Sequence, residues 1–514
     1  MYKFLNVLTA LVLTVCLIGC ERIDDSDPDP TYNTTGIWVL NSMDRVENYK
    51  SFSPGNKINL YLAKGEAEHF QIVLETEERG SISFEQVNPR EGISVSLSEI
   101  RVFEDEFDPL VPVTTDLSTK TQLIKLWVTY ETSINAQEGE FTDKLRFTGT
   151  AGNYEVEVAC KVYNVAIPVK PSVPAIMGIN PLRVSSAAQG EAMYEKRKEF
   201  MDELLKRRMQ PYMCLWHPNG VPMAVECISS PYPWNDSRTL DYMADERLTH
   251  LLLPSHLVTT EEIKTFANQV TTRFPQKKQV YYVRDEPTSI ADYQLIQDKS
   301  VEIKSINSKA QVLTTFYRGP TDPNNTDFND LLSVWDHLNG YTDIFCIGVW
   351  ALQNKEDRAE RCRLKSGNQE EFWTYTAMGD RPGLTHANGT TSIDNHAIMW
   401  RIYKERAEGY LFWVVNAFSS LSPLRSRSEL PEGDGVLVYP GESFNSETPV
   451  ISMRLERFRD GLEDFELMYL LEKKTSRAHV LSILENVYKG PAAVSTNPNH
   501  VIAFKVKLME EILK

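Results

Sequence analysis

Residues 279–287 read QVYYVRDEP, and this short stretch predicts the fold of most of the chain. The four residues at 280–283 are β-branched or aromatic, which is the composition of a buried strand. Pro287 cannot donate a hydrogen bond to a sheet, so the strand must end before it. Asp285 and Glu286 therefore lie where a strand gives way to a helix, and α/β folds collect their catalytic groups at that end of the strands.

The same alternation of strand and helix repeats on both sides of this stretch. Eight apolar runs of strand length follow residue 174, and eight is the strand number of a (β/α)8 TIM-type barrel. The sequence predicts such a barrel over residues 174–475, with an open doubly wound sheet as the competing topology. No GxGxxG or Walker loop follows any run, which argues against nucleotide binding. The predicted strands are residues 175–179, 211–216, 248–253, 280–284, 311–316, 343–349, 371–376 and 410–415.

The segment before the barrel has a different pattern. Residues 36–168 contain short strand-like runs separated by turn signals, and residues 154–163 alternate apolar and polar side chains as a half-buried strand does. This pattern predicts a β-sandwich. Three prolines at residues 165–174 indicate the domain boundary. The predicted fold class is therefore α/β plus all-β: an N-terminal β-sandwich, a (β/α)8 barrel, and C-terminal helices in residues 476–514.

The first residues have the features of an export signal. Lys3 precedes an apolar run at residues 7–18 that is too short to span a bilayer, so residues 1–19 are predicted to be a signal peptide. Leu-Ile-Gly-Cys at its end resembles a bacterial lipobox, which would make Cys20 the lipidated first residue, followed by an acidic tether at 20–35. We expect a bacterial outer-membrane lipoprotein that faces the cell surface or the periplasm.

The composition narrows the possible partners. The net charge of -17 argues against nucleic acid or an anionic membrane surface as the partner. Five of the seven cysteines lie after Cys20, and their wide spacing without a CxxC indicates neither a disulfide framework nor a zinc site. The nine histidines show no metal-binding spacing, and no GxSxG or HExxH occurs. We therefore expect no metal and no cofactor.

Polar and aromatic residues gather at the predicted strand ends. Sugar rings stack their C–H faces on aromatic rings while their hydroxyls need polar partners, and Trp and Tyr offer both. Each of these aromatics could equally be a core residue, but as a set they favour a glycan as the substrate. The predicted substrate-binding residues are Trp216, His217, Tyr317, Trp350, Tyr375, Trp413 and Asn416.

The two carboxylates could simply be solvated loop charges or helix caps. As neighbours they cannot flank a glycosidic bond from opposite faces, as the carboxylate pair of most glycosidases does. Their proximity suits a substrate-assisted route instead. Glu286 would act as the general acid and then as the base. Asp285 would hold the 2-acetamido group of the sugar, whose carbonyl oxygen attacks the anomeric carbon.

Four stretches carry a resemblance to a known family. Residues 281–287, 433–441 (GDGVLVYPG) and 454–466 (RLERFRDGLEDFE) resemble the glycoside hydrolase family 123 type, and residues 65–71 (GEAEHFQ) resemble the sandwich domain of that bacterial lipoprotein group. The resemblance implies a β-N-acetylgalactosaminidase with a sandwich and a barrel that works by substrate assistance. The family's Asp-Glu pair corresponds to Asp285 and Glu286.

Residues 454–466 contain many charges, which we expect to form surface ion pairs with a structural rather than a catalytic role. Our leading hypothesis is a lipid-anchored hydrolase that removes a terminal β-linked N-acetylhexosamine, with N-acetylgalactosamine as the expected sugar. One alternative is a non-catalytic glycan-binding surface lipoprotein. Another is a hydrolase for a sugar without an acetamido group, which would need a second carboxylate across the cleft.

Overall fold

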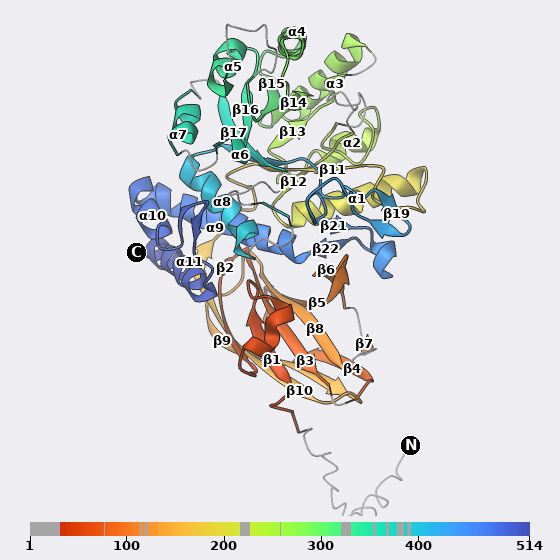
Figure 1. Cartoon of the computed structure of the whole chain (residues 1–514), viewed down its shortest axis with the longest axis vertical. Helices are drawn as coiled ribbons and strands as arrows, with labels where there is room; N and C mark the ends of the chain where they lie inside the picture. Colours follow the sequence, from red (N-terminus) through yellow and green to blue (C-terminus); the bar gives the residue numbers. More distant parts are fainter. Residues whose placement is uncertain are drawn as a thin grey trace, which may run out of the picture.

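Two layers of the molecule, a β-sandwich and a barrel, lie one above the other, with the C-terminal helices alongside (Figure 1). The structure is a computed structural model. It describes residues 31–76, 78–113, 116–118, 122–215, 227–256, 259–319, 330–352, 356–365, 370–377, 385–387 and 392–514. The predicted signal peptide and Cys20 lie outside these residues.

The sandwich consists of a larger and a smaller sheet that enclose an apolar core. The larger sheet has the order β1 (Ile37–Asn41), β3 (Ala67–Glu75), β8 (Leu123–Thr132), β5 (Ile93–Phe103), β6 (Glu106–Pro112), β22 (Val450–Ser452) and β21 (Val438–Tyr439). The smaller has the order β2 (Lys57–Lys64), β10 (Tyr154–Ala166), β9 (Gly139–Gly149), β4 (Ser81–Gln86) and β7 (Asp116–Ser118). The larger sheet thus includes two strands, β22 and β21, from far beyond residue 168. Sequence periodicity does not reveal that these strands belong to the sandwich.

The barrel strands are parallel, and the first pairs with the last. The sheet is therefore a barrel and not the open doubly wound alternative. Its strands are β11 (Ala175–Ile179), β12 (Gln210–Met213), β13 (His250–Leu252), β14 (Lys278–Arg284), β15 (Gln311–Phe316), β16 (Ile344–Gly348), β17 (Glu371–Thr376) and β18 (Gly409–Phe412). Its helices are α1 (Glu191–Lys206), α2 (Ser237–Tyr242), α3 (Thr260–Arg273), α4 (Ile290–Ile306), α5 (Leu331–Leu338), α6 (Val349–Leu352), α7 (Glu356–Lys365) and α8 (Ile393–Glu405).

The barrel strands are mostly apolar because both of their faces are largely buried. In β14, Val280 and Tyr282 belong to the cluster inside the barrel, whereas Tyr281 and Val283 belong to the cluster that includes the helices. The inner cluster also contains Tyr212, Cys346, Trp373 and Tyr375. Side-chain alternation along each strand therefore decides which residues reach the interior.

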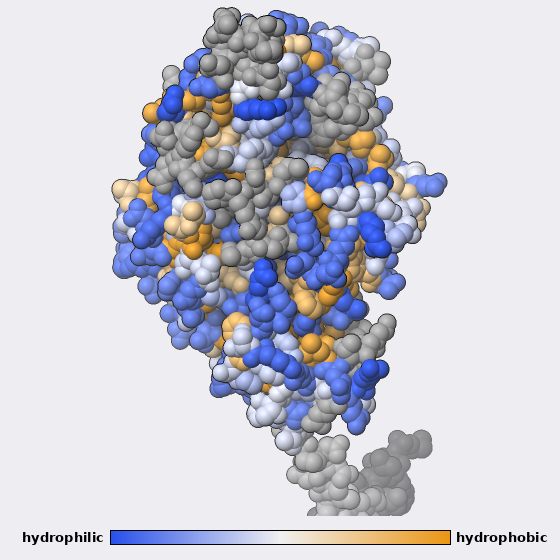
Figure 2. All heavy atoms as spheres, in the orientation of Figure 1, coloured by the Kyte–Doolittle hydropathy of each residue, from blue (hydrophilic) through white to orange (hydrophobic). Residues whose placement is uncertain are grey.

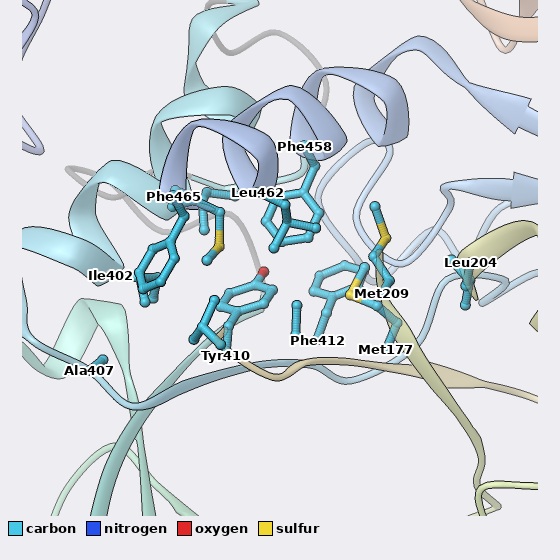
Figure 3. Close-up of a cluster of buried hydrophobic side chains, with 14 of the residues drawn as sticks. Met177, Leu204, Met209, Ile402, Ala407, Tyr410, Phe412, Phe458, Leu462 and Phe465 are labelled. Carbon is cyan, nitrogen blue, oxygen red and sulfur yellow. The ribbon is translucent and has the colours of Figure 1, made fainter. Parts of the chain in front are cut away.

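The chain ends in three helices: α9 (Met453–Lys474), and then α10 (Arg477–Leu484) and α11 (Pro498–Leu513) within residues 476–514. Helix α9 packs on the barrel: its Phe458, Leu462 and Phe465 face Tyr410 and Phe412 of β18 (Figure 3). Gly461 allows a close approach, because a Cβ there would lie 2.2 Å from the carbonyl oxygen of His396 in α8. The remaining short elements are β19 (Ser420–Leu421), β20 (Leu424–Arg425), β23 (Tyr488–Gly490), β24 (Ala493–Val494) and the 3-10 turns Val46–Ser51 and Gly441–Phe444.

The expectation of surface ion pairs in residues 454–466 is wrong. Their charged side chains lie in a buried network between the sandwich and the barrel, and Arg454, Glu456, Arg459 and Glu463 are each at most 5% exposed. The sequence pattern did not predict this burial. A helix that contacts neighbours on nearly every side has no separate solvent-exposed face, so the positions of its charged residues do not show which of them are buried.

The network joins the sequence stretches that carry the family resemblance. Arg454 donates hydrogen bonds to the carboxylate of Asp108 and to the carbonyl oxygen of Gly433. Glu463 accepts one from the backbone N–H of Ala67, and the side chain of Asp460 lies 3.3 Å from His69. Three of the four resembling stretches therefore meet around α9, where their side chains connect the sandwich to the barrel.

Hydrophilic residues predominate on the face drawn in Figure 2, and hydrophobic residues lie among them in small groups. Within the described residues, no helix combines the length and apolar character needed to cross a membrane.

Candidate active site

The end of β14 is irregular, and this irregularity places the two carboxylates. The pairing of β14 with β15 shifts register between Tyr282 and Arg284, a bulge of the kind that redirects side chains next to active sites. Glu286 follows with a φ of 45°, a left-handed conformation that is uncommon for a residue with a side chain. Such conformations persist where the surrounding contacts over-determine them.

The helix after the pair is fixed by its own cap. Ser289 and Asp292 form a capping box at the start of α4, in which the side chain of Ser289 accepts from the backbone N–H of Asp292. Asp292 also pairs with Arg284 at 2.6 Å. The chain on both sides of Asp285 and Glu286 is thus held, and the helix-cap function that could have explained the pair belongs to Ser289 and Asp292.

Asp285 is held by two hydroxyl groups from inside the barrel. Tyr282 donates a hydrogen bond to Oδ1 of Asp285 at 2.9 Å, and Thr315 of β15 donates one to the same oxygen at 2.8 Å. Burial raises the pKa of Asp285, while these hydrogen bonds and the charge of Arg284 lower it. The carboxylate is therefore oriented through one oxygen.

Glu286 shares one of these partners and has another of its own. Its backbone N–H donates to the hydroxyl of Thr315 at 3.0 Å, and its Oε1 accepts from the hydroxyl of Tyr375 in β17 at 2.5 Å. Burial, together with the charge of Asp285, raises the pKa of Glu286 to about 7, against smaller lowering effects from Tyr375 and Arg318. Glu286 can therefore gain or lose a proton near neutral pH, as a general acid and base must.

Three of the predicted aromatic residues lie together beside this pair. The rings of Trp350 and Tyr375 meet edge to face with centroids 5.0 Å apart, and the ring of Tyr317 lies 6.2 Å from that of Trp350. Since Tyr375 contacts Glu286, the three aromatic rings extend outward from the carboxylate. The exposed Arg318 lies over the ring of Tyr317 at 5.0 Å, so the group has a cation at its rim.

The other predicted substrate-binding residues have different positions. Asn416 is fully buried, and its side-chain amide exchanges two hydrogen bonds with the backbone of Asn180, which ties the chain after β18 to the chain after β11. Trp413 is partly buried with its ring against Gly435. Trp216 and His217 lie outside the described residues.

Sequence reasoning missed Tyr282 and Thr315 as site residues. Both were within the predicted strands, and both lie on the inward face that alternation assigns from their neighbours Val280 and Leu313. An inward polar side chain near the carboxyl end of a barrel strand was the signal that could have found them. Among the described residues, no group of three or more His, Cys, Asp or Glu side chains is arranged to hold a metal ion.

The pKa of Glu286 leads to a prediction about stability. A carboxyl whose pKa is raised by folding stabilises the folded state at low pH, and that stabilisation is lost as the pH rises through the folded pKa of about 7. The buried negative charge should cost on the order of 2–3 kcal/mol at pH 8. We therefore expect Glu286→Gln to raise the Tm at pH 8 by a few degrees and to leave it nearly unchanged at pH 4.5. Thermal unfolding at both pH values measures this, and an equal Tm change at both would contradict it.

The part of the chain that contains the candidate site matches a known protein family. Residues 263–471 match the family described as "Glycoside hydrolase 123, catalytic domain". No curated protein sequence matches the chain. Among solved structures, the chain is similar to a family 123 glycoside hydrolase from Clostridium perfringens, described as hydrolysing glycolipid glycans. The TM-score is 0.67 and the identity 14%, over 93% of this chain and 98% of that one.

Other glycoside hydrolases are more distant. A putative β-galactosidase from Bacteroides fragilis has 10% identity and a TM-score of 0.30, over 77% of this chain and 58% of that one. A family 39 glycoside hydrolase from Bacteroides cellulosilyticus has 10% identity and a TM-score of 0.30, over 79% and 81%. These values are too low to add to the argument. The sequence match to the family 123 catalytic domain contains both Asp285 and Glu286, so the part of the chain that resembles this family includes the candidate active site.

Proposed function

We propose that the protein removes a terminal β-linked N-acetylhexosamine, with N-acetylgalactosamine as the preferred sugar, by substrate-assisted catalysis with retention. The observation that carries this proposal is the pair of neighbouring carboxylates with different surroundings. Asp285 is oriented through one oxygen by Tyr282 and Thr315, whereas Glu286 has a pKa near 7. Groups of one type with different environments take different roles in acid–base catalysis.

In the first step, Glu286 in its protonated form donates a proton to the glycosidic oxygen as the bond to the anomeric carbon breaks. The carbonyl oxygen of the 2-acetamido group attacks that carbon and forms a cyclic oxazolinium ion. Asp285 accepts the hydrogen bond of the acetamido N–H through Oδ2, because its Oδ1 receives the two hydroxyls. In the second step, Glu286 takes a proton from water, which opens the ring from the original face.

The aromatic group of Tyr317, Trp350 and Tyr375 offers stacking surfaces for the sugar rings. The same group supports the alternative of glycan binding without turnover, so the decisive measurement is hydrolysis. We expect turnover of nitrophenyl β-N-acetylgalactosaminide, slower turnover of the N-acetylglucosaminide, and none of the β-galactoside, which lacks the internal nucleophile.

A thiazoline analogue of the cyclised sugar should inhibit competitively. Turnover of the plain galactoside at a comparable rate would instead favour the hydrolase with a separate carboxylate nucleophile. Binding of the N-acetyl sugars without any turnover would favour the binding protein.

We also infer from residues 1–20 that the mature protein is a lipoprotein of the bacterial outer membrane, anchored through Cys20. Metabolic labelling with a fatty acid tests this inference, since Cys20→Ala should abolish the label. Labelling that persists in this variant would refute it.

A further inference from the structure

The barrel has one seam at which two neighbouring strands do not pair directly. No ladder joins β12 to β13 in the described residues. The gap is bridged by Ile228 and Ser229, which precede α2. Ile228 exchanges two backbone hydrogen bonds with Met213 of β12, at 2.8 and 2.9 Å. Ser229 donates its backbone N–H to the carbonyl oxygen of Leu252 in β13, and its side-chain hydroxyl accepts from the backbone N–H of Leu252.

Two cysteines lie opposite each other beside this bridge. Cys214 follows Met213, and Cys227 precedes Ile228, so they form the next pair along the antiparallel bridge. Because Met213 and Ile228 exchange both of their hydrogen bonds, Cys214 and Cys227 occupy the adjoining non-hydrogen-bonded pair, in which the Cα atoms approach to about 4.5 Å. That separation lies within the roughly 4.4–6.8 Å range of disulfide-linked residues.

The side chains point toward each other. In this structure both are thiols, and Sγ of Cys214 donates a hydrogen bond to Sγ of Cys227 at 3.2 Å. Cys214 and Cys227 are 6% and 2% exposed. Non-bonded carbon atoms pack best at about 3.5–4.0 Å, and sulfur is larger than carbon, so this separation is short for two thiols in simple contact. We propose that Cys214 and Cys227 form a disulfide bond that fastens the bridging segment to β12 at the barrel seam.

The chemistry is an exchange with a small-molecule or protein disulfide. One cysteine thiolate attacks a sulfur of the oxidant, which forms a mixed disulfide and releases one thiolate. The second cysteine thiolate then attacks the protein sulfur of that mixed disulfide, which completes the internal bond and releases the other thiolate. The two protein thiols lose two protons and two electrons, and the oxidant is reduced to two thiols. Since both sulfurs are buried, the bond forms while the chain folds.

The bond would act close to the active site. Cys214 and Cys227 belong to the same cluster inside the barrel as Tyr282 and Tyr375, which hold Asp285 and Glu286. Cys214 also donates its backbone N–H to the carbonyl oxygen of Ile179, at the carboxyl end of β11. A covalent link here would keep the catalytic end of the barrel closed at its seam.

Differential labelling of the full chain tests the proposal. The reduced, denatured protein is refolded in a buffer of reduced and oxidised glutathione. It is then denatured in the presence of iodoacetamide, which alkylates every cysteine that is still a thiol. It is next reduced and labelled with N-ethylmaleimide, and its peptides are identified by mass spectrometry. We expect N-ethylmaleimide at Cys214 and Cys227, and iodoacetamide at Cys160, Cys346 and Cys362, the other buried cysteines. Iodoacetamide at Cys214 and Cys227 would overturn the proposal.

A double-mutant cycle that compares melting temperatures gives an independent test that does not depend on labelling. If the bond exists, Cys214→Ala, Cys227→Ala and the double variant lose the same loop constraint, so each should lower the Tm of the oxidised protein by about the same few degrees. Reduction of the wild-type protein should lower its Tm similarly and leave the double variant unchanged. Additive losses from the two single variants, with no effect of reduction on the wild type, would show two independent thiols.

Discussion

Glu286→Gln should lower kcat/KM for a β-N-acetylgalactosaminide by about a thousandfold or more. General acid–base catalysis typically contributes factors of about 10²–10⁴, and the amide of glutamine can neither donate the proton to the leaving oxygen nor take one from water. The substitution preserves the shape of the side chain and can keep the hydrogen bond from Tyr375. Burial and the charge of Asp285 hold the pKa of Glu286 near 7, so kcat/KM of the wild-type enzyme should fall as the pH rises above about 7.

Substrates with different leaving groups distinguish the role of Glu286 from that of Asp285. A dinitrophenyl leaving group needs little protonation, so Glu286→Gln should lose far less activity on it than on a poor leaving group. Asp285→Asn should lose similar factors on both, because Asp285 acts on the internal nucleophile. Glu261→Gln, an exposed carboxylate change on α3, is the matched control and should retain wild-type kinetics. If Glu286→Gln lost no more activity than this control, the proposed mechanism would be refuted.

Arg454→Met should destabilise the protein by about 3–5 kcal/mol, the usual cost of leaving one partner of a buried ion pair uncompensated. Two nitrogens of the guanidinium bind the two oxygens of Asp108, at 3.0 and 2.7 Å, and both residues are at most 5% exposed. The arginine also donates to the carbonyl oxygens of Gly433 and Val436. Its removal would leave a buried carboxylate and several carbonyl groups unsatisfied between the two domains.

Thermal and denaturant unfolding measure this effect, with a Tm decrease of about 5–10 °C expected. Arg427→Met is the matched control, because Arg427 pairs with Glu429 on the surface and its loss should cost less than about 0.5 kcal/mol. Asp108→Asn added to Arg454→Met should recover part of the stability by removing the unpaired charge. Equal destabilisation by Arg454→Met and Arg427→Met would show that the buried network does not stabilise the domain interface.

The sequence predicted the architecture well because barrel strands have a strong local signal. All eight predicted strands correspond to β11–β18, and the closure of the sheet by β11 and β18 decides between the two topologies that periodicity left open. The polar sequence after β14 likewise placed Asp285 and Glu286 at a strand end. Both results depend on short-range features, such as apolar runs and a proline, that a single sequence displays directly.

The contacts that make the site work depend on residues distant in the sequence. Thr315 joins Asp285 to Glu286 from the neighbouring strand, and Tyr375 reaches Glu286 from β17, 89 residues further along the chain. Periodicity did not predict the burial of the charges of α9 for the same reason, since their partners come from both the sandwich and the barrel. The sequence alone determined where strands end and which residues carry charge. Only the tertiary structure decided which charges are buried together, because desolvation and pKa depend on neighbours that folding brings into contact.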